Sequence, residues 1–319
     1  MLKNKKNKTV GILGLGSIGL RHAKNCLEEN LVVFGYDKCE EKERNAKKHG
    51  IKILSKKALS EITKNFIICT PSSLHHDDLK FLLKKAKKIL VEKPFTDDYL
   101  KTKKILKNSQ DIEIFTGFNL RFHSIVDKVK QILDKKLLGK ILWSNSIVCS
   151  DLRLWRPGSD IKKNYTNNIL SGGVINDYSH EIDLIHYFFG KNKSIFSFKK
   201  NSKHLGLKVD DYAAILMESK NNVFSNITMD YCCSPSIRQG VIRGIEASIF
   251  YDLIKRQIRV VSKDGKMILN ETHNTSFDQD YKDEIKSFLN IKKKNKIRLA
   301  TANDGIEVSR LINLIYKNK

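Results

Sequence analysis

The 319-residue sequence lacks the features that mark several protein classes. No apolar run approaches the roughly 18 residues of a membrane-spanning helix, so we expect no membrane partner. Its six cysteines show no C-x-x-C spacing, which argues against the common zinc sites and favours free thiols in a cytoplasmic protein. The basic N-terminus leads directly into a strand pattern, so a signal peptide is not expected. Neither an internal repeat nor a long low-complexity linker is present.

Arginine is scarce, although the net charge is +24. Only 11 of the 59 basic residues are Arg, and the lysines are scattered through predicted helix surfaces, as in residues 83–88. Recognition of bases favours Arg, and binding of single strands needs clustered aromatic side chains. Because neither pattern occurs, we expect no nucleic-acid partner. We interpret the abundant Lys and Asn instead as a genome-wide compositional bias, in which the charge can still help to recruit an anionic substrate such as a nucleotide sugar.

Three glycines near the N-terminus carry the most informative pattern, because Gly14, Gly16 and Gly19 match G-x-G-x-x-G. Gly14 permits a tight turn, Gly16 lets the backbone approach a pyrophosphate, and Gly19 lets a helix pack close to a strand. Ser17 and Ile18 lie at the start of the predicted helix, where N–H groups and the helix dipole favour phosphates. The motif therefore predicts a bound dinucleotide.

The surroundings of these glycines support this prediction. A strand over 9–13 leads in, a helix over 17–28 leads out, and a second strand over 31–36 is followed by Asp37. An acid about 20 residues past the glycines accepts hydrogen bonds from a ribose 2′-hydroxyl, and it repels a 2′-phosphate. We therefore predict NAD as the cofactor, with NADP less favoured.

Short apolar strands alternate with amphipathic segments through the first part of the chain. This alternation predicts an α/β fold with an N-terminal Rossmann domain, a doubly wound parallel sheet. Strands are expected at 9–13, 31–36, 51–54, 66–70, 89–91 and 112–115. Helices are expected at 17–28, 39–48, 57–62, 74–86, 98–108 and 124–135. Ligands of such sheets bind at the carboxyl ends of the strands, which directs attention to the residues just after each strand.

After Gly139 the sequence changes character and predicts a C-terminal α+β domain with a large, mostly antiparallel open sheet. The expected elements are a strand at 140–149, several long strands between 194 and about 270, and helices at 175–189, 281–289 and 302–316. We predict an NAD-binding domain over 1–122 and a domain for substrate binding and oligomerisation over 123–319. The C-terminal helix is expected to pack back on the first domain. The open sheet face predicts a homodimer or homotetramer.

Polar residues follow the fourth predicted strand. Thr70, Pro71 and His75 are expected to line the cofactor cleft. A simpler interpretation is a polar turn in which a serine at 72 or 73 caps the next helix, and both interpretations can hold together. Residues 76–78, one histidine and two acids, are expected on the solvated helix surface.

Glu92, Lys93 and Pro94 follow the fifth predicted strand, and we place Glu92 and Lys93 at the cofactor. A lysine at the end of a buried strand differs from the many surface lysines, because it can bring a fixed positive charge to the nicotinamide and to a substrate oxygen. Such a charge stabilises developing alkoxide character during hydride transfer. Pro94 sets the direction of the backbone, in the trans or the cis form.

Asn119 and Arg121 follow the sixth predicted strand and can bind ribose or substrate oxygens. An equally weighted alternative has Asn119 as a helix cap and Arg121 on the surface.

The densest group of polar residues lies over 171–183. If this segment is helical from Ile175, then Asp177, His180 and Asp183 share one face at i, i+3 and i+6. A histidine is suited to moving a proton near neutral pH, and a carboxylate can orient it or bind substrate. The alternatives are a capping role for Asp177 and a core position for His180. Asp-x-x-His can also form half of a metal site, but no second ligand cluster accompanies it, so no metal is expected.

Taken together, these motifs resemble the Gfo/Idh/MocA family of NAD(P)-dependent oxidoreductases. The resemblance runs in order over nearly the whole chain. The matching residues are Gly14, Gly16, Gly19, Thr70, Pro71, His75, Glu92, Lys93, Pro94, Asn119, Arg121, Asp177 and His180.

One subgroup of this family is similar in a further stretch, Trp155-Arg156-Pro157, Tyr165 and residues 172–181. Members of that kind often act on sugars or nucleotide sugars for surface carbohydrates. This chain departs from the pattern at Ser171, where a third glycine is common. The spacing from Asp177 to His180 is three residues, where many relatives have four. These departures bear on substrate geometry more than on reaction type.

The resemblance implies that Lys93 and His180 are the catalytic pair and that Asp177 holds the substrate or His180. Arg156 and Tyr165 become candidate substrate contacts, for example to a phosphate or carboxylate. We therefore predict an NAD-dependent dehydrogenase acting on a secondary alcohol or ketone of a sugar, nucleotide sugar or cyclitol. The alternatives are an NAD-dependent glycosidase that uses transient oxidation, and a non-catalytic NAD or sugar sensor.

Overall fold

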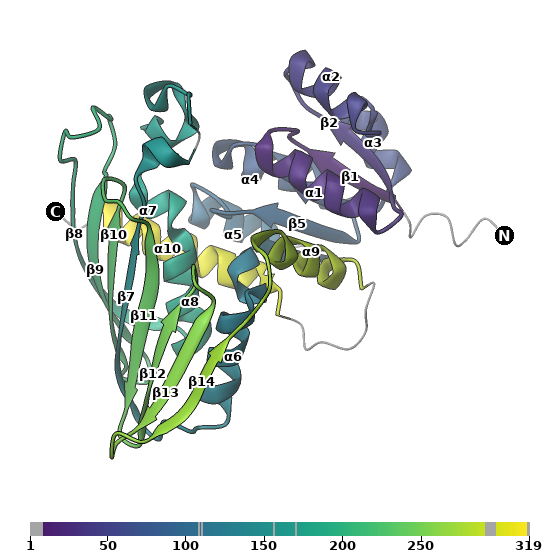
Figure 1. Cartoon of the computed structure of the whole chain (residues 1–319). Helices are drawn as coiled ribbons and strands as arrows, with labels where there is room; N and C mark the ends of the chain where they lie inside the picture. The colour runs from purple at the N-terminus through teal and green to yellow at the C-terminus, as the bar shows by residue number, and fades with distance from the viewer. Residues whose placement is uncertain are drawn as a thin grey trace. The chain divides into compact units, whose positions relative to one another are not determined.

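The computed structural model describes residues 9–107, 109, 111–155, 157–169, 171–290 and 298–317 (Figure 1). The chain forms two compact units. Unit 1 comprises Met1–Asn119 and Asp278–Ser309, and unit 2 comprises Leu120–Phe277 and Arg310–Lys319. In the part of the chain that is described, no helix is both long and apolar enough to cross a membrane.

Unit 1 is built on a seven-stranded sheet in the order β15-β6-β5-β4-β1-β2-β3. Its strands are β1 (Thr9–Leu13), β2 (Val32–Tyr36), β3 (Lys52–Ile53), β4 (Asn65–Ile68), β5 (Lys88–Glu92), β6 (Glu113–Gly117) and β15 (Ala300–Thr301). All neighbours pair in parallel except β15, which runs antiparallel to β6. The order reverses between β1 and β4, as in doubly wound dinucleotide-binding sheets.

Helices connect these strands. They are α1 (Ser17–Glu28), α2 (Glu40–Lys48), α3 (Lys56–Ile62), α4 (Ser72–Leu82) and α5 (Tyr99–Leu106). The segment that returns to unit 1 late in the chain contains α9 (Phe277–Phe288), apart from its first residue, and the start of α10 (Ala302–Lys317). The central strands are apolar on both faces, and Ile67, Ile68, Leu90 and Val91 are fully buried. Helices on both faces of a parallel sheet account for such continuous apolar runs.

Unit 2 contains an eight-stranded sheet in the order β14-β13-β12-β11-β7-β10-β9-β8. The strands are β7 (Ile141–Cys149), β8 (Asn192–Lys200), β9 (Tyr212–Ser219), β10 (Phe224–Asp230), β11 (Ile237–Gly244), β12 (Ala247–Asp252), β13 (Gln257–Ser262) and β14 (Met267–Thr272). Only the β7–β10 pair is parallel among these described strands. The predicted fold class, a Rossmann sheet followed by a mostly antiparallel sheet, is confirmed.

Helices cover one face of the unit 2 sheet. They include α6 (Ser124–Asp134), which contacts β12 and β13, and α8 (Ser179–Phe189), which contacts β10 (Figure 1). Alternate residues of β9 and β10 are buried on this side, as a period of two requires. The opposite side carries exposed apolar residues, among them Phe196 and Phe224. Among the residues that the structure describes, one face of this sheet is therefore open.

Candidate active site

Three glycines shape the loop between β1 and α1, each for a different reason. Gly14 has a φ of +89°, and a Cβ there would lie 2.6 Å from the backbone of Cys69. A Cβ on Gly19 would lie 1.9 Å from the carbonyl oxygen of Gly14. A Cβ on Gly16 would instead meet no described atom within 4 Å. Gly14 and Gly19 are thus required for the packing of the protein itself, whereas Gly16 leaves open space beside the loop.

That open space lies at the N-terminus of α1. Gly16 is the N-cap residue, and no described side chain caps this end of the helix. Ser17 is exposed and Ile18 is half-buried. N–H groups at an uncapped helix start favour an anion, so this end of α1 fits the pyrophosphate of a dinucleotide.

Asp37 follows β2 and is held against the same loop. Its Oδ2 accepts a hydrogen bond from the Leu15 N–H at 2.7 Å, and its Oδ1 accepts one from the Cys39 N–H at 2.9 Å. The carboxylate is therefore fixed beside the glycines, where an acid accepts ribose hydroxyls. Together with the space at Gly16, this arrangement fits NAD.

His75 in α4 connects two loops at strand ends. Its Nε2 lies 2.8 Å from the Thr70 carbonyl oxygen, and its Nδ1 lies 3.1 Å from that of Pro94. The ring is 1% exposed. Both nitrogens are used within the protein, so we reassign His75 from a direct cofactor contact to a positioning residue. It links the loop after β4 to the loop that carries Lys93.

The turn around Thr70 differs from expectation in two respects. Pro71 is the N-cap of α4, so neither serine caps the helix as the simpler interpretation expected. His76 and Asp78 are buried rather than solvated. Asp78 accepts a hydrogen bond from the Thr70 hydroxyl at 2.6 Å and pairs with Lys56. The acid is buried because it anchors the strand-end turn, a long-range role that helical spacing does not reveal.

Glu92 and Lys93 lie at the carboxyl end of β5. The Glu92 Oε1 lies 2.6 Å from the Nε2 of His22 on α1, and its Oε2 accepts a hydrogen bond from the Lys93 N–H at 3.1 Å. The Lys93–Pro94 peptide bond is cis. Glu92 therefore uses its carboxylate to hold the loop backbone, whereas Lys93 is half-buried at the strand end where it was expected.

Asn119 begins a short 3-10 helix, η2 (Asn119–Phe122), just after β6. The residue is 2% exposed, and its Nδ2 has no hydrogen-bond partner in the described part of the chain. Buried polar atoms in native proteins are nearly always satisfied by a protein group, water or a ligand. An orphaned donor at a strand end is consistent with a bound cofactor that supplies the acceptor.

Arg121 belongs to unit 2 and is buried, so the alternative that placed it on the surface is wrong. Its Nε donates to the Asp183 Oδ2 at 2.9 Å, and its Nη2 donates to the Oδ1 at 2.6 Å. The guanidinium also stacks on the Tyr187 ring, 4.6 Å from its centroid. A bidentate pair of this kind fixes α8 through Asp183. Asp183 therefore holds Arg121, and a contact between Arg121 and substrate stays a prediction.

The predicted single helix over 175–189 is wrong. The segment forms α7 (Val174–Asp177) and α8, separated at Tyr178 with φ −92° and ψ 24°. Asp177 therefore ends one helix and His180 lies in the first turn of the next, so the two do not share the face of one helix. Both residues are buried, with 7% and 8% exposure.

Long-range contacts hold α7 in place. The Asp210 Oδ2 accepts a hydrogen bond from the Ile175 N–H at 3.3 Å, and its Oδ1 accepts one from the Tyr316 hydroxyl at 2.9 Å. Gly173 has a φ of +97°, and a Cβ there would lie 2.6 Å from Asp210. Gly173, a glycine of the sequence motif, is thus required for the close approach of Asp210 to the start of α7.

Tyr231 binds the Asp177 carboxylate through its hydroxyl and is fully buried. Burial and the nearby Asp177 charge raise the pKa of Tyr231 well above its usual range, so the hydroxyl remains protonated. The sequence prediction missed this residue. Its contact with Asp177 joins residues 54 positions apart, so no local pattern signals it.

An aromatic cluster surrounds Tyr231. The Trp155 ring centroid lies 5.6 Å from that of Tyr178 and 5.5 Å from that of Tyr231, both in edge-on arrangements. Such pairs favour a fixed mutual geometry. Tyr165 lies in η5 (Tyr165–Asn167) and is 51% exposed. Arg156, the other predicted substrate contact, lies outside the described residues.

Family comparison agrees with both parts of this architecture. A family model described as an oxidoreductase family with an NAD-binding Rossmann fold matches residues 8–112, and one described as the GFO/IDH/MocA C-terminal domain matches residues 126–250. The chain belongs to the GFO/IDH/MocA family. Within this family it is an NAD-binding oxidoreductase, which confirms the predicted enzyme class and cofactor.

Individual GFO/IDH/MocA proteins show how far the likeness extends. The chain is 28% identical to glucose-6-phosphate 3-dehydrogenase of Bacillus subtilis over 249 residues, which is 72% of this chain and 69% of that protein. It is 24% identical to myo-inositol 2-dehydrogenase of Thermotoga maritima, covering 93% of this chain and 91% of that one. A levoglucosan dehydrogenase structure with NADH and L-sorbose superposes with a TM-score of 0.84 at 15% identity, covering 97% and 96% of the chains.

Proposed function

We propose that the protein oxidises a secondary alcohol, or reduces the corresponding ketone, on a sugar, nucleotide sugar or cyclitol. The observation that carries this proposal is the loop at Gly16 with Asp37 fixed beside it, together with a lysine at the end of β5. The relatives named above act on a sugar phosphate and on inositol, which supports the substrate class.

We assign roles to the residues as follows. His180 takes the proton of the substrate hydroxyl as general base, a task suited to an imidazole near neutral pH. Asp177, held by the protonated Tyr231, orients the substrate or His180. Lys93 stabilises negative charge that develops on the substrate oxygen. When bound, NAD supplies the hydride acceptor.

Substrate choice is assigned to unit 2. Tyr165 is exposed enough to contact a ligand, and we keep Arg156 as a contact for an anionic substituent. A role in surface-carbohydrate synthesis rests on the resemblance of the Trp155–Pro157 stretch to one subgroup. The second candidate, an NAD-dependent glycosidase with transient oxidation, would use the same residues without net redox change.

Substrate assays with purified protein and NAD test this proposal. We expect a sugar phosphate, myo-inositol or a nucleotide sugar to produce NADH, measured by absorbance, together with a ketone product identified by mass spectrometry. Cleavage of a glycoside without net NADH would favour the glycosidase. NAD binding without turnover of any substrate in a broad sugar and cyclitol panel would contradict both enzymatic functions.

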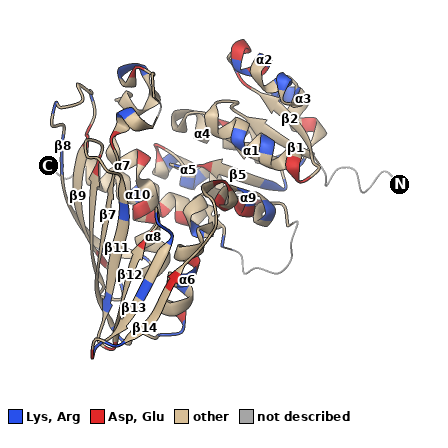
Figure 2. Cartoon of the chain, in the orientation of Figure 1, with Lys and Arg blue, Asp and Glu red and all other residues tan. Residues whose placement is uncertain are grey.

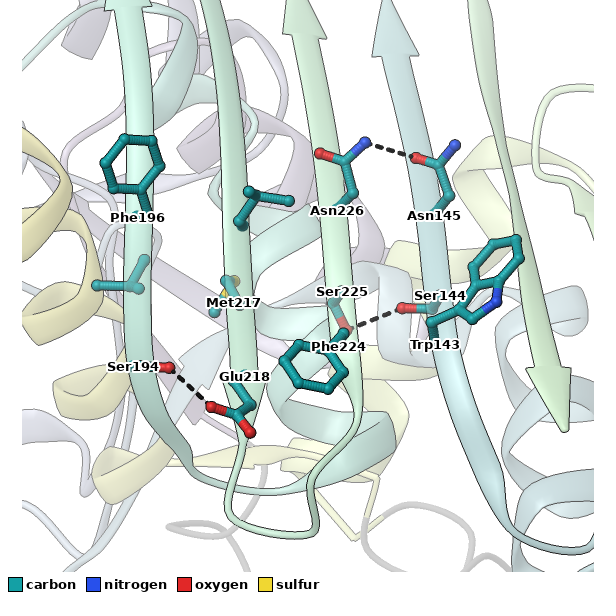
Figure 3. Close-up of a pocket in the computed structure, with 12 residues that line it drawn as sticks. Trp143, Ser144, Asn145, Ser194, Phe196, Met217, Glu218, Phe224, Ser225 and Asn226 are labelled. Atoms are coloured by element: carbon teal, nitrogen blue, oxygen red, sulfur yellow. Dashed lines mark hydrogen bonds between the residues drawn. The ribbon is translucent and has the colours of Figure 1, made fainter.

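We also propose that the open face of the unit 2 sheet binds a second copy of this chain. Figure 3 shows Phe196, Phe224 and Trp143 projecting from this face, with Asn145 and Asn226 hydrogen-bonded between β7 and β10 at 3.2 Å. Phe196 is 67% exposed and Phe224 is 59% exposed. A broad apolar face is suited to an isologous interface, in which the same surface is used twice.

Replacing Phe196 and Phe224 together with Glu is expected to convert the oligomer to single chains, because like charges would meet across the interface. Light scattering after size exclusion measures the mass. Leu100→Glu is the matched control, because Leu100 on α5 is 57% exposed and lies outside the sheet. A wild-type protein that has the mass of one chain at working concentration would contradict the interface.

Basic residues are distributed over many elements rather than gathered on one, as Figure 2 shows for α1, α3 and β13. This distribution supports our interpretation of the lysines as a compositional bias rather than a nucleic-acid surface.

A further inference from the structure

His22 lies on the buried face of α1, the helix whose start fits the pyrophosphate. It is surrounded along this face by small side chains, among them Gly19, Ala23 and Cys26. The histidine itself is 0% exposed. Burying a polar ring costs free energy unless the ring gains a hydrogen bond, so the partner of His22 indicates what the residue does.

That partner is Glu92, at the carboxyl end of β5. The His22 Nε2 lies 2.6 Å from the Glu92 Oε1, and the Glu92 Oε2 accepts a hydrogen bond from the Lys93 N–H at 3.1 Å. We assign the shared proton to Nε2, because an ionised carboxylate only accepts hydrogen bonds. The His22 Nδ1 has no hydrogen-bond partner in the part of the chain that is described. A path of hydrogen bonds therefore runs from α1 through Glu92 to the backbone of Lys93.

Packing fixes where the ring and the carboxylate meet. The ring of Tyr281 on α9 meets the His22 ring edge-on, with centroids 5.8 Å apart. Gly117 on β6 lies opposite Glu92 in the sheet, and a Cβ there would lie 3.0 Å from the Glu92 Oε1. The absence of a side chain at Gly117 thus leaves the room that the carboxylate occupies. All four residues belong to unit 1 (Figure 1).

A third group that can ligate a metal lies beside this pair. Glu284 is 0% exposed, and its carboxylate lies within 4.8 Å of the ligand atoms of His22 and Glu92. Two ligands of one tetrahedral zinc ion lie about 3.3 Å apart, because each is about 2.0–2.1 Å from the metal. The 2.6 Å between Nε2 and Oε1 is shorter than this and fits a charge-assisted hydrogen bond. His22 and Glu92 therefore share a proton rather than a metal ion.

We propose that His22 is a positioning residue for Lys93. Through Glu92 it ties the backbone of Lys93 to the helix that is assigned to the pyrophosphate, so the lysine and the cofactor keep a fixed relation. His75 holds the same loop by a second contact, because its Nδ1 lies 3.1 Å from the Pro94 carbonyl oxygen. A misplacement of about 1 Å can lower turnover about 10²-fold. This inference rests on the proposed catalytic function of Lys93.

Two substitutions of His22 separate positioning from packing. His22→Leu fills the buried space without a donor, whereas His22→Gln keeps an N–H group near the position of Nε2. With NAD and the substrate that produces NADH in the assay above, we expect kcat to fall about tenfold in His22→Leu and to stay within about threefold of wild type in His22→Gln. KM and the affinity for NADH should change less than about twofold, because the glycine loop is untouched. The reverse order of the two variants would overturn the assignment, since leucine suits an apolar core better than an amide does.

Combination with Lys93→Ala tests whether His22 acts through the lysine. In a Lys93→Ala background we expect His22→Leu to cause no further loss of turnover, because an absent amine cannot be misplaced. A further loss of about tenfold there would overturn the assignment. Wild-type turnover in Lys93→Ala would reject both the proposed role of the lysine and this inference. Slow turnover in Lys93→Ala together with wild-type turnover in His22→Leu would reject this inference alone.

Amide hydrogen exchange, measured by mass spectrometry on a peptide over 90–97, reports on the loop without any substrate. We expect this peptide to exchange about threefold faster or more in His22→Leu, with no change in the glycine loop. Asn25→Leu is the matched control, because Asn25 is another buried polar residue of α1, and its exchange over 90–97 should be that of wild type. Equal acceleration in this control would indicate a general loosening of α1 and count against the assignment.

Gly117→Ala tests the same link from β6 and gives a second measurement if His22→Leu fails to fold. Its methyl group would lie 3.0 Å from the Glu92 Oε1, so the carboxylate must shift while His22 is unchanged. We expect exchange over 90–97 to rise and kcat to fall, with KM little changed. Wild-type exchange and wild-type kcat in Gly117→Ala would overturn the assignment.

Discussion

His180→Ala is expected to lower turnover by about 10²-fold or more, the usual contribution of a positioned general acid or base. Lys93→Ala should cause a loss of similar size, because the charge that stabilises the substrate oxygen disappears. Both variants should keep their fold and still bind NADH, since neither residue belongs to the glycine loop. Steady-state rates on the identified substrate, together with NADH titration by fluorescence, measure the two effects separately.

Matched controls make this result specific. His204→Ala and Lys101→Ala replace exposed residues of the same types outside the candidate site, and we expect both to keep wild-type rates. If His180→Ala and Lys93→Ala retained near-wild-type turnover, the assignment of the catalytic pair would be wrong. A loss of NADH binding in Lys93→Ala with unchanged turnover at saturation would limit Lys93 to holding the cofactor.

Gly19→Ala should lower the stability of the protein, whereas Gly16→Ala should weaken its binding of NAD. The methyl group of Gly19→Ala would lie 1.9 Å from the Gly14 carbonyl oxygen, so α1 must move and we expect a loss of about 3 kcal/mol or more in unfolding free energy. Gly16→Ala meets no described atom within 4 Å, so the free protein should remain about as stable. Its methyl group would instead occupy space that the pyrophosphate needs, weakening NAD binding about tenfold or more.

Thermal or denaturant unfolding without cofactor, followed by NADH titration, separates these two outcomes. Gly50→Ala offers a further comparison, because Gly50 has a φ of +83° but open space around it. Its cost should therefore be that of backbone strain alone, about 1 kcal/mol. Tight NADH binding by Gly16→Ala would contradict the assignment of the pyrophosphate to this loop.

Local patterns were sufficient to predict most of unit 1. The strand over 9–13 and the helix over 17–28 have the predicted limits, because an apolar strand, a glycine turn and an amphipathic helix follow one another directly. Other boundaries moved by a few residues, as for β4 and α4. In unit 2 the antiparallel sheet was predicted, but the parallel pairing of β7 with β10 was not. Pairing between strands so far apart in sequence leaves no local signal.

The residues of the candidate site divide in the same way, into those that a local pattern predicts and those that long-range contacts place. Residues at strand ends, such as Asp37 and Lys93, could be found because a single rule places them. The break at Tyr178 could not, since helical spacing continues through it, and the start of α7 is held by Asp210, a partner far along the chain. The burial of Arg121 likewise depends on Asp183, 62 residues away. Helical spacing alone predicts that such residues lie on the surface or share one face of a single helix.

The discontinuous construction of unit 1 has a consequence for how the chain folds. The Thr116 hydroxyl on β6 donates to the Thr301 carbonyl oxygen across 185 residues, and the ring of buried His22 packs against Tyr281 of α9. The Rossmann sheet therefore gains its last strand only after the intervening unit 2 sequence has been crossed. Such long-range closure slows folding relative to a continuous domain of equal size. A fragment that stops at Asn119 would leave the β6 edge unpaired and open to association with other chains.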